Sequence, residues 1–221
     1  MQSSTRIIAI GLVVAVVGAA IGWWGYGAHQ KRELRKTIVG LVADSASRMR
    51  EALATPADSP ETTRRDEEHA AAADRNLAQL KSLAAAREQL LADAADDYLL
   101  TSREILKRVV ESRRYRQMLT ESLQALTEHM RSDNRTGTWV QEAVKARERV
   151  NKDHRGYAAA TTALDKLLPS FLDSQKRIAP DVGPAVLIDA TAIEAARARV
   201  ASAASQAEAE VAKSRQLETF R

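Results

Sequence analysis

The chain has 221 residues, of which 28% are charged, only 4% are aromatic and none is cysteine. This length allows one membrane anchor and one domain of ordinary size. The lack of cysteine excludes disulfides, thiol catalysis and cysteine-ligated metal sites such as zinc fingers. A composition poor in aromatic residues and rich in alanine favours helices over sheets. We therefore expect an all-α protein.

The formal net charge of +4 is concentrated near the N-terminus. Five basic residues and one acidic residue fall within the first 36 positions, so the remainder of the chain is neutral overall. A neutral domain lacks the basic face with which nucleic-acid-binding proteins displace counterions from phosphates. We therefore expect no nucleic-acid partner.

Residues 7–28, IIAIGLVVAVVGAAIGWWGYGA, carry no charge. As a helix they would span the roughly 30 Å of bilayer hydrocarbon. Trp23, Trp24 and Tyr26 lie near one end, where amphipathic rings favour the lipid headgroups. The stretch predicts a single transmembrane helix within an N-terminal anchor of residues 1–30. The alternative is a signal peptide cleaved after Gly18-Ala19-Ala20, but the long apolar stretch and the single preceding basic residue favour an uncleaved anchor.

A stripe of small residues follows one side of this predicted helix at spacings of three and four. Small residues let two helix backbones approach closely in lipid, where packing drives association. The stripe therefore predicts a helix-packing face, although glycine and alanine are also common in membrane helices in general. Its members are Gly11, Ala15, Gly18, Gly22 and Gly25.

Four basic residues, Lys31, Arg32, Arg35 and Lys36, follow the apolar stretch directly. Beside a bilayer they can contact anionic headgroups. We therefore expect a single-pass protein of the bacterial inner membrane. The positive-inside rule places the domain in the cytoplasm. A short N-terminal tail carrying Arg6 is also common on the cytoplasmic side of exported domains, so the opposite orientation stays open.

Beyond residue 30 the pattern predicts a bundle domain of residues 31–221. Prolines, glycines and capping residues place its helices at about 31–54, 60–132, 138–178 and 186–219. A break is possible near 96–102, and Pro169 should kink the third of these helices. Short turns make successive helices antiparallel. We therefore expect an elongated, coiled-coil-like antiparallel bundle of four passes, whose C-terminus returns toward the bilayer.

Apolar residues at helical spacing mark the face of each helix that should be buried. Ser112 and Arg116 interrupt the face of the second helix, so we expect weaker packing there. The predicted buried positions include Leu34, Ile38, Leu41, Met49, Leu77, Leu80, Ala84, Leu91, Ala94, Tyr98, Ile105, Val109, Leu119, Leu123, Leu126, Met130, Val150, Tyr157, Leu164, Leu168, Phe171, Ile193, Val200, Ala207 and Val211.

The sequence offers little catalytic chemistry. Asp66-Glu-Glu-His69 resembles half of a di-iron motif, but a second such motif is lacking, and a solvated helix start is the better interpretation. The arginine cluster Arg108, Arg113, Arg114 and Arg116 is interpreted as a solvated face paired with glutamates on the same helix. We expect no catalytic residues, no metal site and no cofactor.

These features favour a non-catalytic structural or accessory subunit that packs its membrane helix within a larger complex. Its partners would be the lipid bilayer and other membrane subunits, or further copies of the chain. An anchor that runs directly into a helical bundle also resembles the ligand-binding half of bacterial chemoreceptors, which implies an extracytoplasmic sensor. The chain departs from that architecture because no second apolar span follows the bundle. A tether between the membrane and a distant partner is a third hypothesis.

Overall fold

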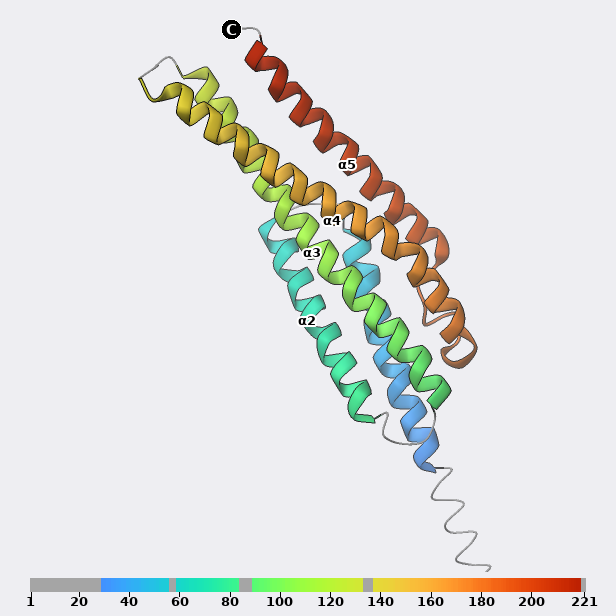
Figure 1. The fold of residues 1–221 in the computed structure, drawn as a ribbon. Helices are drawn as coiled ribbons and strands as arrows, with labels where there is room; N and C mark the ends of the chain where they lie inside the picture. The colour runs from blue at the N-terminus through green and yellow to red at the C-terminus, as the bar shows by residue number, and fades with distance from the viewer. Residues whose placement is uncertain (1–28, 56–58, 84–88, 133–136, 220–221) are drawn as a thin grey trace, which may run out of the picture.

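The computed structural model describes residues 29–55, 59–83, 89–132 and 137–219. Over these ranges the chain is all-α and contains no strand. Residues 29–54 are helical and are called the first helix below. Four further helices follow, namely α2 (Pro60–Leu83), α3 (Gln89–Arg131), α4 (Trp139–Val182) and α5 (Ala190–Thr219). They form the elongated helical bundle shown in Figure 1.

Within the described ranges, no helix combines the length and apolarity needed to cross a bilayer. The predicted membrane span 7–28 lies outside those ranges. The same is true of the predicted packing residues Gly11, Ala15, Gly18, Gly22 and Gly25, and of Trp23, Trp24 and Tyr26.

The described part of the chain makes five passes along the bundle, whereas the sequence predicted four. The predicted helix over 60–132 corresponds to two helices, α2 and α3, and α3 runs without interruption through 96–102. This separation adds a fifth pass, so the end of α5 lies at the opposite end of the bundle from residue 29 (Figure 1). Sequence pattern missed the division because no glycine or proline occurs between Pro60 and Gly137.

Local chemistry explains where several helices begin and end. Ser59 caps α2, since its hydroxyl accepts the backbone N–H of Thr62 (3.2 Å) while its own N–H donates to the Thr62 hydroxyl (2.9 Å). The helix α4 ends at Gly183, which adopts a positive φ of 83° and donates its N–H to the carbonyl of Ala179 (3.0 Å). Contrary to the predicted end near residue 178, α4 continues through both Pro169 and Pro180.

A buried side-chain amide holds the connection between α4 and α5. Gln175 donates to the carbonyl of Ile188 (3.1 Å) and accepts the Ile188 N–H (2.8 Å), so both amide groups are used. Asp189 then caps α5 by accepting the N–H of Thr191 (2.9 Å). These bonds fix the position at which α5 starts back along the bundle.

The apolar core is divided into two clusters along the bundle axis. The larger cluster joins the first helix, α2, the first half of α3, the second half of α4 and the start of α5, and it includes the ring pair Tyr98–Phe171 (5.2 Å between centroids). The smaller cluster lies in the half of the bundle farther from residue 29, which we call the distal half. Only α3, α4 and α5 contribute to it, through Leu119, Leu126, Val150, Tyr157, Ala207 and Val211. Most of the predicted buried positions are buried, but Leu34, Ala94, Leu123, Met130 and Val200 are only half-buried, and Ala84 lies outside the described residues.

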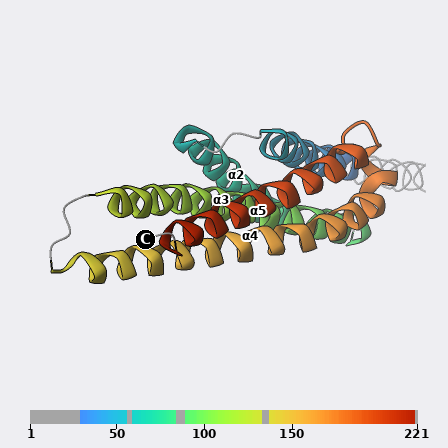
Figure 2. The same ribbon diagram turned by 90° about the horizontal axis from the view of Figure 1, so that it is seen from above.

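The α3–α4 hairpin projects beyond the other helices at its tip (Figure 2). Near the end of α5, Arg215 donates to the side chain of Asn151 (3.4 Å), and residues 139–149 of α4 lie past that contact. The two helices of the hairpin approach closely at Gly156, because a Cβ at this position would overlap the ring of Tyr115.

Replacement of Gly156 by alanine should therefore destabilise the bundle. The added methyl group forces the Tyr115 ring away, and overpacking of this kind costs about 1–3 kcal/mol, which outweighs the roughly 0.5–1 kcal/mol that alanine gains over glycine within a helix. Gly40→Ala is the control, because nothing lies within 4 Å of its new Cβ. That change should stabilise the first helix by about 0.5–1 kcal/mol. Chemical denaturation followed by circular dichroism measures both, and equal stabilisation by the two changes would contradict this packing.

Candidate functional site

The first helix ends in the middle of the bundle, where a buried arginine of α3 receives it. Arg113 donates from Nη2 to the carbonyls of Ala52 (3.2 Å) and Thr55 (2.9 Å). Its Nε lies 2.5 Å from the Asp66 carboxylate of α2, and the two side chains are 6% and 0% exposed. One guanidinium therefore joins the first helix, α2 and α3.

This arrangement answers two physical needs. The last carbonyls of a helix lack intrahelical donors and attract cations, so Arg113 caps the first helix in the favourable sense. Asp66 in turn needs a cation, because an isolated buried carboxylate is strongly disfavoured. Burial raises the pKa of Asp66, and the positive charge of Arg113 opposes that rise.

The sequence interpretation of Asp66 and His69 as a solvated helix start is wrong, since both side chains are buried. His69 lies 3.4 Å from the Glu51 carboxylate, and Arg65 lies 3.3 Å from the same carboxylate. These contacts tie α2 to the end of the first helix. In the described part of the chain, no group of histidine and acidic side chains is arranged to hold a metal ion.

The interpretation of the arginine cluster as a solvated face is wrong for two of its members. Arg113 is buried, and Arg116 is mostly buried and forms a two-pronged ion pair with Glu210 of α5 (2.8 and 2.9 Å). Arg114 is exposed and pairs with Glu67 of α2 (2.6 Å). Arg108 pairs with Glu111 on its own helix, as predicted (2.6 Å). A single sequence gave no signal for partners on other helices.

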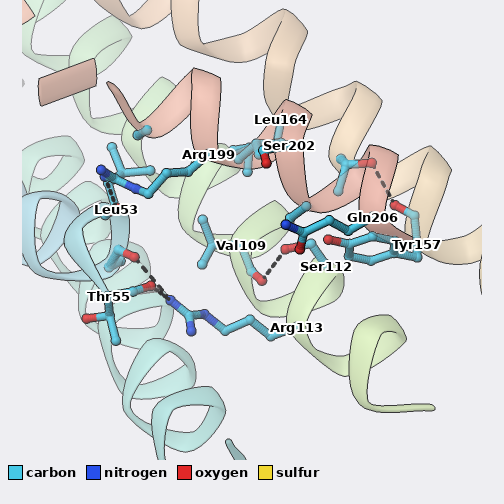
Figure 3. Close-up of a pocket in the computed structure, with 15 residues that line it drawn as sticks. Leu53, Thr55, Val109, Ser112, Arg113, Tyr157, Leu164, Arg199, Ser202 and Gln206 are labelled. Atoms are coloured by element: carbon cyan, nitrogen blue, oxygen red, sulfur yellow. Dashed lines mark hydrogen bonds between the residues drawn. The ribbon is translucent and has the colours of Figure 1, made fainter. Parts of the chain in front are cut away.

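A pocket of about 340 Å³ opens beside this junction, and we call it the central pocket (Figure 3). The end of the first helix forms one wall, while α3, α4 and α5 form the others. Arg199 of α5 enters from one side and donates to the carbonyl of Leu53 (2.8 Å). The remaining lining is mostly aliphatic or small, with polar groups from Ser112, Thr161, Ser202 and Gln206.

The four predicted membrane-interface residues that are described lie at the proximal end of the bundle, near residue 29. All four are exposed. Arg35 pairs with Asp181 of α4 (3.4 Å), and Lys36 pairs with Glu33 one turn away (2.8 Å). Lys31 and Arg32 form no ion pair with any residue that the structure describes.

The opposite end carries exposed apolar side chains that sequence analysis did not identify. Val140 and Val144 of α4 are 65% and 51% exposed. They line a hollow of about 170 Å³ together with Met130, Trp139, Ala143 and Arg147. Trp139 stacks on His129 of α3 (5.1 Å between centroids), which holds the indole at this tip. The signal in the sequence was Trp139-Val-Gln-Glu-Ala-Val144, which exposes two valines one turn apart.

No family model, curated protein or solved structure matches this chain. The residues themselves therefore carry the functional inference. They comprise a basic proximal end, a buried polar junction with its pocket, and an apolar distal tip.

Replacement of Arg113 by methionine should destabilise the bundle far more than the same change at Arg114. The first change leaves Asp66 buried without its cation, which typically costs about 3–5 kcal/mol. The second removes an exposed pair with Glu67, whose loss costs at most about 1 kcal/mol. Chemical denaturation of both variants measures the difference. Equal losses in the free energy of unfolding would contradict a buried ion pair between Arg113 and Asp66.

The loss in Arg113→Met should also depend on pH. Without the arginine, burial raises the pKa of Asp66 further, so the folded variant binds this proton more tightly than the unfolded chain does. The deficit relative to the parent protein should therefore shrink as the pH falls toward the ordinary pKa of aspartate. Denaturation at neutral and mildly acidic pH tests this, and a constant deficit would contradict it.

Proposed function

We propose that this protein is a non-catalytic, membrane-anchored structural or accessory subunit of a larger membrane assembly. The observation that supports it best is the contrast between the two ends of the bundle. Lys31 and Arg32, which form no ion pair with any described residue, lie at the proximal end next to the predicted anchor, and exposed apolar side chains lie at the distal tip. A surface that attracts lipid headgroups at one end and a partner protein at the other suits such a subunit.

The dimensions of the bundle support a spacing role within the assembly. The 44 residues of α4 extend about 65 Å at 1.5 Å per residue. The first helix enters at the proximal end and is held by Arg113 midway along α3. An anchor continuous with that helix would fix the direction of the whole bundle. The domain could stand on either side of the membrane under this proposal.

A ligand sensor is the second candidate, and the central pocket is the observation that favours it. Pockets between the helices of bundles are common ligand sites, and about 340 Å³ is enough for a small molecule. We place the sensor second because the two arginines at this pocket already donate to main-chain carbonyls of the first helix.

Co-purification from the native membrane in mild detergent tests the proposal. Gly18→Ile and Gly22→Ile would place a branched side chain on the predicted packing face while keeping the anchor apolar. If a partner helix packs there, these variants should insert normally and lose their co-purifying subunits. Val13→Ile and Val17→Leu change the opposite side of the predicted helix and should retain them.

Equal behaviour of the glycine and valine variants would contradict packing through the small-residue stripe. Purification of the parent chain without any companion would contradict the accessory-subunit proposal itself. The readout is the set of proteins that remain in stoichiometric amounts after size-exclusion chromatography.

A further inference from the structure

A second hollow lies beyond the central pocket along the same faces of α3 and α5. It has a volume of about 600 Å³, and we call it the distal groove. Its lining on α3 continues that of the central pocket at helical spacing, from Val109, Ser112 and Arg113 to Arg116, Thr120, Leu123, Gln124, Thr127, Glu128 and Arg131. On α5 the lining passes likewise from Ala196, Arg199, Val200, Ser202, Ala203 and Gln206 to Glu210, Lys213 and Ser214.

The two hollows continue the path of the first helix. In the proximal half, that helix lies beside the connection that precedes α5 and beside α5 itself. Arg50 donates to the carbonyl of Leu187 in the connection (3.2 Å), and Arg199 of α5 donates to the carbonyl of Leu53 (2.8 Å). The first helix then ends at the wall of the central pocket, where Arg113 caps it. Beyond this point α3 and α5 still line the distal groove, and no described part of the first helix reaches that level, since its helical residues end at 54.

The walls of the hollows suit another helix. Small side chains, including Ser112, Thr120, Ala203 and Ser214, line them and allow close approach of a backbone. Leu123 faces the distal groove and is only half-buried, although its spacing is that of a core residue. A segment packed on Leu123 would complete its burial and enlarge the smaller apolar cluster.

The charge of the lining selects the kind of helix. Five basic side chains and two acidic ones line the two hollows. Arg116 and Glu210 neutralise each other, Arg113 is neutralised by the buried Asp66, and Glu128 is the other acid. The excess is therefore positive, and a partner with acidic residues on its flanks is complementary. The basic residues are Arg113, Arg116, Arg131, Arg199 and Lys213.

We propose that the central pocket and the distal groove together receive an amphipathic helix of a partner protein. From Arg113 to Arg131 the seat is about 27 Å long, which fits about 18 helical residues. Small or aliphatic residues of that helix face Leu123 and Ala203, and acidic residues flank them toward Lys213 and Arg131. The inference deepens the proposed accessory function, on which it rests, by naming the partner segment and the surface that receives it.

Site-specific photocrosslinking of the full chain in its native membrane tests the seat. The photoreactive residue p-benzoylphenylalanine replaces Thr120 or Gln124, which line the distal groove, or the neighbouring Glu121 or Ala125, which do not. All four positions are exposed, so each tolerates the probe. The groove positions should give adducts with one protein at least about fivefold above the control positions. Mass spectrometry should place the attached residues in one acidic segment at spacings of three or four.

A charge reversal provides an independent measurement. Lys213→Glu should reduce the adduct at position 124 about fivefold, because it repels the acidic flank of the bound helix. Lys152→Glu makes the same change at an exposed site of α4 that lines neither hollow, and should leave the adduct unchanged.

Several results would overturn the inference. These are equal adducts at groove and control positions, attachment to a basic or non-helical segment, attachment to a second copy of this chain, and no adduct at all. If subunits still co-purify with the chain in any of these cases, the groove proposal fails and the accessory function stands. If co-purification is absent as well, both fail.

Discussion

The capping of the first helix by Arg113 is the interaction on which the rest of the bundle depends. The guanidinium binds the last carbonyls of the first helix and, through Asp66, the start of α2. The end of the first helix and the start of α2 are thereby held at the same position along α3. Because both members of the ion pair are buried, separating them would leave an uncompensated charge in the interior. The junction is therefore costly to open.

The apolar core is broader on the proximal side of this point than on the distal side. The larger apolar cluster draws on five helices, whereas the smaller one draws on three. The distal half also carries the distal groove and the exposed side chains of Val140 and Val144. This uneven distribution favours a protein whose distal half is completed by another molecule.

Composition was enough to predict the all-α class, and helical periodicity was enough to predict most of the buried face of each helix. Leu80, Leu119 and Phe171 are buried as their spacing indicates, because one apolar face per helix has to be covered in any bundle. The junction was missed for a physical reason. Arg113 and Asp66 are charged residues in charged surroundings, and only their tertiary partners distinguish them from solvated neighbours such as Arg114. The division between α2 and α3 was misplaced because neither proline nor glycine marks it.

The direction in which the first helix lies along the bundle has a mechanical consequence. A load applied between residue 29 and the distal tip would act along the helix axes, so the first helix would have to slide past its neighbours rather than peel away from them. Sliding requires the Arg113 cap, the contact of Arg199 with Leu53 and the surrounding apolar contacts to yield together. Because forced unfolding is governed by the rate of crossing that barrier, the bundle should carry tension along its length better than across it.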